Sequence, residues 1–252
     1  GLFYLFFAEL WERFSFYGMR ALLVLYMTKQ LLFTDDMAFG VYAAYMSLVY
    51  VTPMIGGILA DKILGFRKAI LLGGILMALG HFFLTFEQPI FFYGSLALVI
   101  VGNGFFKPNI SSFVGDLYQQ GDARRDAGFT IFYLGINIGA AVAPLACAWF
   151  AEVYGWHYGF VLAGIGMLAG LLVFKQGLKN DVFKNKGLVP NLEHYNTKTL
   201  GLNKGQLITV AAFLTVPVFA LIIRFNEFEH YIVWIVSVFL IGYIVYIYTT
   251  VT

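Results

Sequence analysis

The chain has 252 residues, of which 60% are hydrophobic and only 12% are charged, and its mean hydropathy is +0.79. Soluble domains carry roughly 25% charged residues, so this composition excludes an ordinary soluble domain and predicts a polytopic membrane protein. A net charge of +2, with basic residues spread along the chain, gives no indication of nucleic-acid binding.

Windows of about 20 apolar residues predict eight membrane spans. Their expected ranges are 2–32, 39–60, 69–86, 90–115, 127–151, 156–175, 206–224 and 230–251. Residues 177–205 are polar and basic, and we expect a linker there. It divides a six-helix bundle at 1–176 from a transmembrane helical hairpin at 206–252, which makes the chain an all-α membrane protein.

Basic residues gather in the loops after the second, fourth and sixth spans. They are Lys62, Arg67, Lys68, Arg124, Arg125, Lys175, Lys179, Lys184 and Lys186. By the positive-inside rule these loops and the N-terminus are expected to be cytoplasmic. The chain begins at Gly1 rather than Met and is already apolar there, so no signal peptide is visible and we expect the start to be trimmed.

Small residues within the spans predict closely packed helices. Glycines four residues apart allow backbones to approach in lipid; these pairs are Gly135 and Gly139, Gly155 and Gly159, and Gly166 and Gly170.

The single cysteine, Cys147, excludes an internal disulfide and is expected to be a small packing residue. Prolines at 53, 108, 144 and 217 lie inside spans, where we expect bends rather than hinges. The four histidines have no ligand spacing and predict no metal site.

The stretch from Glu9 to Arg20 in the first span contains four charged side chains. At roughly 100° per residue, one arc about 140° wide holds the charged and neighbouring aromatic residues; they are Glu9, Glu12, Arg13, Phe16, Tyr17 and Arg20. Four central charges cost on the order of 10 kcal/mol without partners. We therefore expect this arc to face a wet crevice inside the protein, although a structural salt bridge is the alternative for each charge.

Lys107, within GNGFFKPNISS, is a further charge inside a span. The flanking Gly102, Gly104 and Pro108 predict a thin, bent helix that is open to a cavity. With Lys107 included, two acids are balanced against three bases, so one positive charge is left for an anionic ligand. Protonation of a glutamate releases a base from its partner, which is the core of a proton-coupled mechanism.

Three neutral polar side chains, Tyr17, Tyr50 and Asn137, are candidates for ligand contact, and Asn137 is the strongest of them. A buried amide in lipid needs a partner, which is either a neighbouring helix or a substrate.

Four motifs together resemble the proton-coupled oligopeptide transporters, a branch of the major facilitator superfamily. They are ExxER at Glu9, Glu12 and Arg13, Lys107 in a GxGxxKPN context, GDLY with RRDAGFTIFYLGINIGA between 115 and 140, and the loop GGILADKILGFRK. The resemblance implies that the six spans form the N-terminal half of that fold, with three plus three helices in inverted repeat. The next two spans would be the hairpin that bacterial members place between halves, and a C-terminal half would complete the protein.

The resemblance also implies a role for each candidate residue. Glu9, Glu12, Arg13 and Lys107 would couple protons, and Arg20 and Lys107 would hold the C-terminal carboxylate of a peptide. Tyr17, Tyr50 and Asn137 would contact the peptide. Phe16 occupies a position where relatives often have tyrosine. Its ring can still pack against the ligand, but it has no hydroxyl to form a hydrogen bond.

The function expected from these residues is symport of di- and tripeptides with protons, inward across a bacterial cytoplasmic membrane, by a monomer that needs no cofactor. Alternatives are a relative that transports nitrate or another small anion, and a facilitator for a different solute. An intramembrane enzyme is disfavoured because no nucleophile has an activating base and no HExxH spacing occurs. A channel would show a polar face on several helices.

Overall fold

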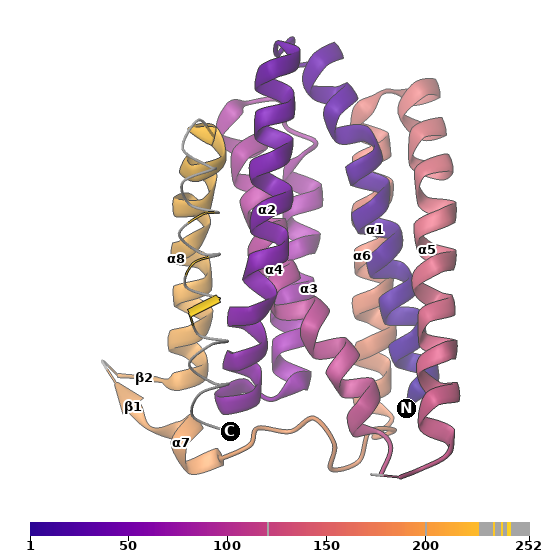
Figure 1. Cartoon of the computed structure of the whole chain (residues 1–252), viewed down its shortest axis with the longest axis vertical. Helices are drawn as coiled ribbons and strands as arrows, with labels where there is room; N and C mark the ends of the chain where they lie inside the picture. Colours follow the sequence, from indigo (N-terminus) through magenta and orange to yellow (C-terminus); the bar gives the residue numbers. More distant parts are fainter. Residues whose placement is uncertain (120, 200, 227–233, 235–237, 239–240, 243–252) are drawn as a thin grey trace.

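The chain forms a bundle of long helices in a computed structural model, which describes residues 1–119, 121–199, 201–226, 234, 238 and 241–242 (Figure 1). The helices are α1 Leu2–Lys29, α2 Asp35–Leu59, α3 Phe66–Phe83, α4 Pro89–Asp116, α5 Arg124–Tyr154, α6 Trp156–Lys179, α7 Leu192–Asn196 and α8 Lys204–Arg224. A π-helical segment, Ala60–Leu64, continues α2. Two short strands, β1 Lys198–Thr199 and β2 Leu202–Asn203, pair antiparallel within the linker.

Among the described residues, six helices are long and apolar enough to cross a membrane, namely α2 with its π-helical extension, α3, α4, α5, α6 and α8. α1 has 28 residues and is long enough to span, since about 20 residues suffice, but its charges set it apart. The expected all-α membrane fold is therefore confirmed. The span expected at 230–251 lies almost wholly outside the described residues.

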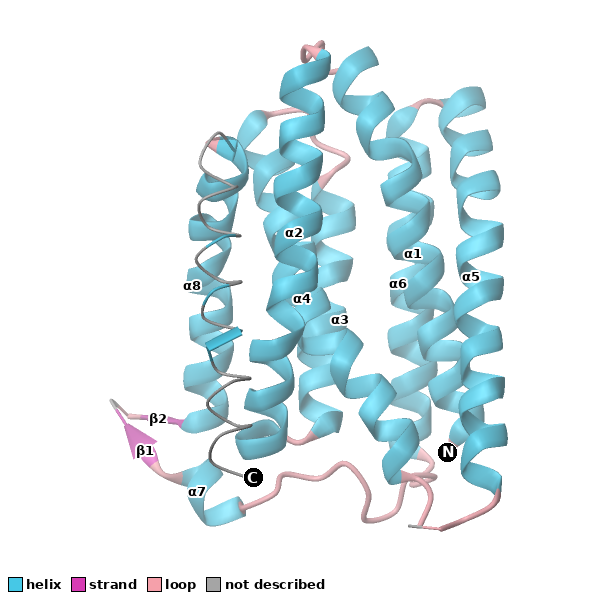
Figure 2. Ribbon diagram, viewed as in Figure 1, coloured by secondary structure: helices cyan, strands magenta, loops and turns pink. Residues whose placement is uncertain are grey.

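The helices pack in two groups, with α8 at one edge (Figure 2). α1 packs most extensively against α5 and α6, and α4 packs against α3 and α2. Contacts between α3 and α6 join the two groups, and α8 lies against α4. The uncharged face of α1 is thus used for packing within the protein.

Close helix approach at glycines confirms two of the three expected pairs. A Cβ at Gly139 would lie 2.3 Å from the carbonyl oxygen of Leu10, and one at Gly170 would lie 3.0 Å from that of Ala8. Both contacts bring α5 or α6 against α1. Gly155 is different, because its φ of +108° places it at the turn between α5 and α6, so Gly155 and Gly159 do not form a pair within one helix.

Cys147 has the expected packing role. It is fully buried, and a Cβ added to Gly18 of α1 would lie 2.5 Å from its sulfur.

The glycines near Lys107 lie at close helix crossings, and Gly104 also lines an apolar groove between α4 and α8, so α4 is open to a cavity at this glycine. Gly104 lies against Thr52 of α2, and Gly102 lies against Met77 of α3. Both glycines are buried at helix crossings. The absence of a side chain lets three helices approach here, and the Thr52 hydroxyl donates a hydrogen bond across the crossing to the carbonyl oxygen of Ile100 at 3.0 Å.

Gly56→Ala is expected to destabilise this crossing. The new Cβ would lie 2.0 Å from the backbone oxygen of Gly104, and backbone cannot move aside cheaply. We expect a loss of about 1–3 kcal/mol, as in other overpacked cores, measured as a lower Tm of the detergent-solubilised protein. Gly94→Ala in α4 is the control, since a Cβ there meets nothing within 4 Å. An unchanged Tm for Gly56→Ala would contradict the tight crossing.

The first part of the linker is anchored to the bundle ends. Arg67 at the start of α3 donates from Nε to the carbonyl oxygen of Lys186 at 2.7 Å, and from Nη2 to that of Lys184. Asp116 at the end of α4 accepts from the backbone N–H of Gly187 at 3.0 Å. This segment, which follows the end of α6, is therefore held against the start of α3 and the end of α4.

Candidate functional site

The charged residues of α1 form one compact buried group, which we call the ion cluster: Glu9, Glu12 and Arg13. Arg13 Nη2 donates to Glu12 Oε1 at 2.6 Å, and Arg13 Nε contacts both Glu12 Oε2 and, at 3.2 Å, Glu9 Oε1. Their exposed fractions are 2%, 0% and 3% in chain order. The guanidinium is thus shared between two carboxylates.

Helix geometry produces this arrangement directly. Residues four apart lie one above the other on an α-helix, so Glu9 and Arg13 meet, and Glu12 reaches the same guanidinium from the adjacent position. Glu9 Oε2 has no hydrogen-bond partner among the described residues, although it is buried. A buried carboxylate oxygen without a donor is an atom at which a proton or a water can be held.

Arg20 lies two helical turns from Arg13 and is paired with α2. Its Nε donates to the hydroxyl of Tyr42 at 2.6 Å, and its guanidinium carbon lies 5.8 Å from the centre of the Tyr42 ring and 5.9 Å from that of Tyr17. Arg20 is only partly buried. Its other N–H groups can therefore meet a ligand. Sequence reasoning missed Tyr42, because the chain has 16 tyrosines and none is distinguished by local pattern.

Lys107 lies beside Tyr50, with its Nζ 5.2 Å from the ring centre. Tyr50 is 62% exposed and Lys107 is half-buried. Glu9, Glu12 and Arg13 are within electrostatic range of Lys107, yet it forms no ion pair with any described carboxylate. The lysine is therefore near the ion cluster and available to an anion.

The last two candidates are placed differently. Phe16 is buried, and its ring centre lies 5.3 Å from the guanidinium carbon of Arg13, so it packs on the ion cluster. Asn137 is exposed on α5, and its Nδ2 donates to the carbonyl oxygen of Tyr133 at 3.0 Å. The expected partner of Asn137 was another helix or a ligand, and in the structure its partner is its own helix.

Tyr45 and Asn103 are among the buried polar side chains that were not singled out from the sequence. Tyr45 and Asn103 are both fully buried, and neither the Tyr45 hydroxyl nor the Asn103 amide has a partner among the described residues. Asn103 precedes Lys107 by four residues and so shares its helix face, which was a usable signal. Tyr45 had no such signal.

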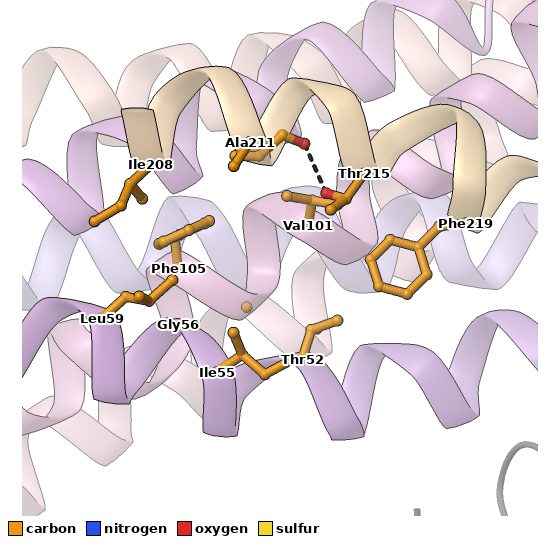
Figure 3. Close-up of a pocket in the computed structure, with 12 residues that line it drawn as sticks. Thr52, Ile55, Gly56, Leu59, Val101, Phe105, Ile208, Ala211, Thr215 and Phe219 are labelled. Atoms are coloured by element: carbon orange, nitrogen blue, oxygen red, sulfur yellow. Dashed lines mark hydrogen bonds between the residues drawn. The ribbon is translucent and has the colours of Figure 1, made fainter. Parts of the chain in front are cut away.

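An apolar groove of about 290 Å³ lies between α8 and the α2–α4 crossing (Figure 3). Ile208 and Phe219 of α8 line one side, and Ile55 and Phe105 line the other. The Thr215 hydroxyl is satisfied by its own helix, donating to the carbonyl oxygen of Ala212 at 2.8 Å. No ionisable side chain lines this groove, so the charged chemistry lies elsewhere. Within the described part of the chain, no three His, Cys, Asp or Glu side chains gather as metal ligands.

Comparison with known proteins relates this site to transporters. An uncharacterized transporter of Bacillus subtilis, YclF, is 46% identical over 197 residues, which are 76% of this chain and 40% of the relative. The peptide transporter YePEPT of Yersinia enterocolitica is 44% identical over 68% of this chain and 35% of its own. Dipeptide and tripeptide permease A of Proteus mirabilis is 39% identical over 84% and 44%. The chain thus spans less than half the length of these relatives.

Solved structures show the same fold. A bacterial homologue of the human drug peptide transporters PepT1 and PepT2 matches with a TM-score of 0.85 and 31% identity, over 99% of this chain and 56% of that one. The transporter PepTSo2, described as tetrameric, matches with a TM-score of 0.80 and 30% identity, over 97% of this chain and 53% of that one. The oligomeric state of the present chain remains a prediction.

The family model PTR2, described as the POT family, matches residues 67–223. That range includes Lys107 and Asn137 but not α1. The ion cluster on α1 is therefore an observation independent of the family match. With more than half of its length matched, the chain belongs to the POT family.

Proposed function

We propose that this chain is the N-terminal part of a symporter that imports di- and tripeptides with protons by alternating access. The observation that supports this most is the ion cluster, in which one buried guanidinium is shared by two buried carboxylates. Two relatives named as peptide transporters support the substrate class.

In this proposal the proton is the co-substrate and no other cofactor takes part. With both carboxylates ionised, Arg13 is held by Glu9 and Glu12. A proton on either carboxylate removes one negative charge. Arg13 then forms a charged hydrogen bond only with the carboxylate that is still ionised, and its interaction with the protonated side chain is weaker. Proton occupancy thereby changes which donors of the site are engaged.

The peptide is proposed to bind through its C-terminal carboxylate to Arg20 and Lys107, which are accessible and form no ion pair with a carboxylate of the described residues. Tyr17 and Tyr50 lie next to these two bases and present ring faces and hydroxyls. Asn137 is exposed on α5 and can turn its amide to a ligand. Phe16 is proposed to pack against Arg13 and the ligand without a hydroxyl contact.

The wider arrangement is also part of the proposal. Residues 1–176 form the six-helix transport bundle, residues 177–205 a cytoplasmic linker, and residues 206–252 a transmembrane hairpin. The N-terminus faces the cytoplasm, the membrane is the bacterial cell membrane, and a C-terminal half of the same protein completes the peptide site. Basic residues in alternate loops support this orientation.

A carrier for nitrate, another small anion or a different solute is the alternative, because the bases bind any anion. Uptake into liposomes containing the intact transporter separates these functions. We expect dialanine to accumulate when an inward proton gradient is imposed and to equilibrate without one. The proposal would be contradicted if dialanine uptake did not depend on the proton gradient, or if the transporter took up nitrate and not dialanine.

A further inference from the structure

The ion cluster and Arg20 are separated along α1. Arg20 follows Arg13 by seven residues, about 10.5 Å at the helical rise. Phe16 lies between them on the same face, and its ring neither donates nor accepts a conventional hydrogen bond. Tyr17 of the same arc lies beside Arg20, with its ring centre 5.9 Å from the guanidinium carbon, and a polar group from a neighbouring helix would extend this end of the interval toward the ion cluster.

The Arg20–Tyr42 hydrogen bond aligns α2 with α1 at this point. The two helices are consecutive and run in opposite directions (Figure 1). One turn along α2 from Tyr42 therefore corresponds to one turn back along α1 from Arg20, toward Arg13. Tyr45 is the residue one turn from Tyr42. Glu12, Arg20, Tyr42 and Arg13 are all within its electrostatic range.

The Tyr45 hydroxyl has the chemistry needed to bridge the two groups. The side chain is fully buried, and its oxygen has no partner among the described residues, whereas buried tyrosine hydroxyls usually find one. An ionised carboxylate only accepts hydrogen bonds and a guanidinium only donates them, but a phenol hydroxyl does both. It can therefore serve Glu12 and Arg20 at once.

We propose that Tyr45 is a positioning residue that links the ion cluster to Arg20. Its hydroxyl donates toward the ionised carboxylate of Glu12 and accepts from an N–H of Arg20, each through one water. When Glu12 takes a proton, the carboxyl group donates to Tyr45 instead, and the hydroxyl loses its strongest acceptor. Arg20 then presents its donors differently to a ligand carboxylate. This inference rests on the proposed function for the roles of Glu12 and Arg20.

The charged and titratable groups around Tyr45 come from two helices. They are Glu12, Arg13 and Arg20 of α1 and Tyr42 of α2; Glu9 and Lys107 are connected to this group through the ion cluster. Replacement of the hydroxyl alone leaves all of these in place, so Tyr45→Phe isolates its contribution.

Tyr45→Phe in the intact transporter, reconstituted in liposomes, is the first test. Because a hydrogen bond to a charged group is lost, we expect proton-driven accumulation of dialanine to fall at least about tenfold, with a displaced pH dependence of uptake. Counterflow exchange, which needs no net proton movement, should persist. Tyr26→Phe is the matched control: Tyr26 is equally buried with an unpartnered hydroxyl, but its ring lies among Phe92, Trp156 and Phe160. It should retain wild-type accumulation and pH dependence.

A second measurement does not depend on transport. Infrared spectroscopy follows the protonated carboxyl band that disappears in Glu12→Gln, and we expect its pH midpoint to differ between wild type and Tyr45→Phe. An unchanged midpoint and unchanged uptake profile would overturn the role of Tyr45, as would an equal effect of Tyr26→Phe. Absence of peptide uptake by the wild type would instead contradict the proposed function, and the infrared midpoints would still decide the role of Tyr45.

Discussion

Glu12→Gln is expected to reduce proton-driven accumulation of dialanine to the level of protein-free liposomes while counterflow exchange stays measurable. Glutamine keeps one oxygen that accepts from Arg13, but it cannot take up or release a proton. Arg13 retains Glu9 as a carboxylate partner at 3.2 Å, so the buried guanidinium is not left unpaired and the fold should persist. Accumulation and exchange are measured on the same liposomes.

The matched control for this variant is Glu152→Gln. Glu152 is exposed on α5 and belongs to no ion pair with the described residues, so its neutralisation should leave accumulation intact. Wild-type accumulation in Glu12→Gln would remove Glu12 from the coupling role and leave its bond with Arg13 as a structural contact.

Lys107→Ala is expected to abolish both accumulation and exchange. Its ammonium group lies beside exposed Tyr50 and has no carboxylate partner among the described residues, so a ligand carboxylate is its natural counter-ion. Lys107 is half-buried in the free protein, and a bound peptide would bury its ammonium group together with the ligand carboxylate. Truncating one partner of such a buried pair costs about 2–5 kcal/mol, which is more than tenfold in affinity. Binding of dialanine to the purified protein should weaken accordingly.

Lys175→Ala provides the comparison, because Lys175 is exposed near the end of α6 and should not affect binding. The two variants at the site are distinguished by exchange, which Glu12→Gln retains and Lys107→Ala loses. Normal transport by Lys107→Ala would show that the lysine serves the structure alone.

Local spacing was sufficient to predict part of the ion cluster. Glu9 and Arg13 are one turn apart, so any α-helix through these residues brings the two together. Adjacent residues do not face each other on a helix, so the contact between Glu12 and Arg13 depends on their side-chain conformations. The same kind of reasoning located the spans that correspond to α2, α3, α4, α5, α6 and α8, because about 20 consecutive apolar residues have few other stable environments. Both inferences depend only on residues that are near one another in the chain.

Predictions that depended on a neighbouring helix were less successful. Arg20 is paired with Tyr42, which no pattern distinguished, and Asn137 bonds to its own helix. Gly102 and Gly104 were interpreted as flanking a cavity; they admit α3 and α2 at close range, and the cavity that Gly104 lines is an apolar groove against α8. A glycine permits either arrangement, and its own sequence context does not distinguish them.

The sequence by itself determined the membrane-embedded all-α class, the family resemblance and the charges that share one face of α1. Only the tertiary structure decided which side chains from α2 and α4 meet that face, including Tyr42, Tyr45 and Lys107 with Tyr50. The physical reason is that a helix sets the positions of its own residues through a constant rise and rotation. The rotation and axial shift of one helix against another follow from packing over their whole contact surface.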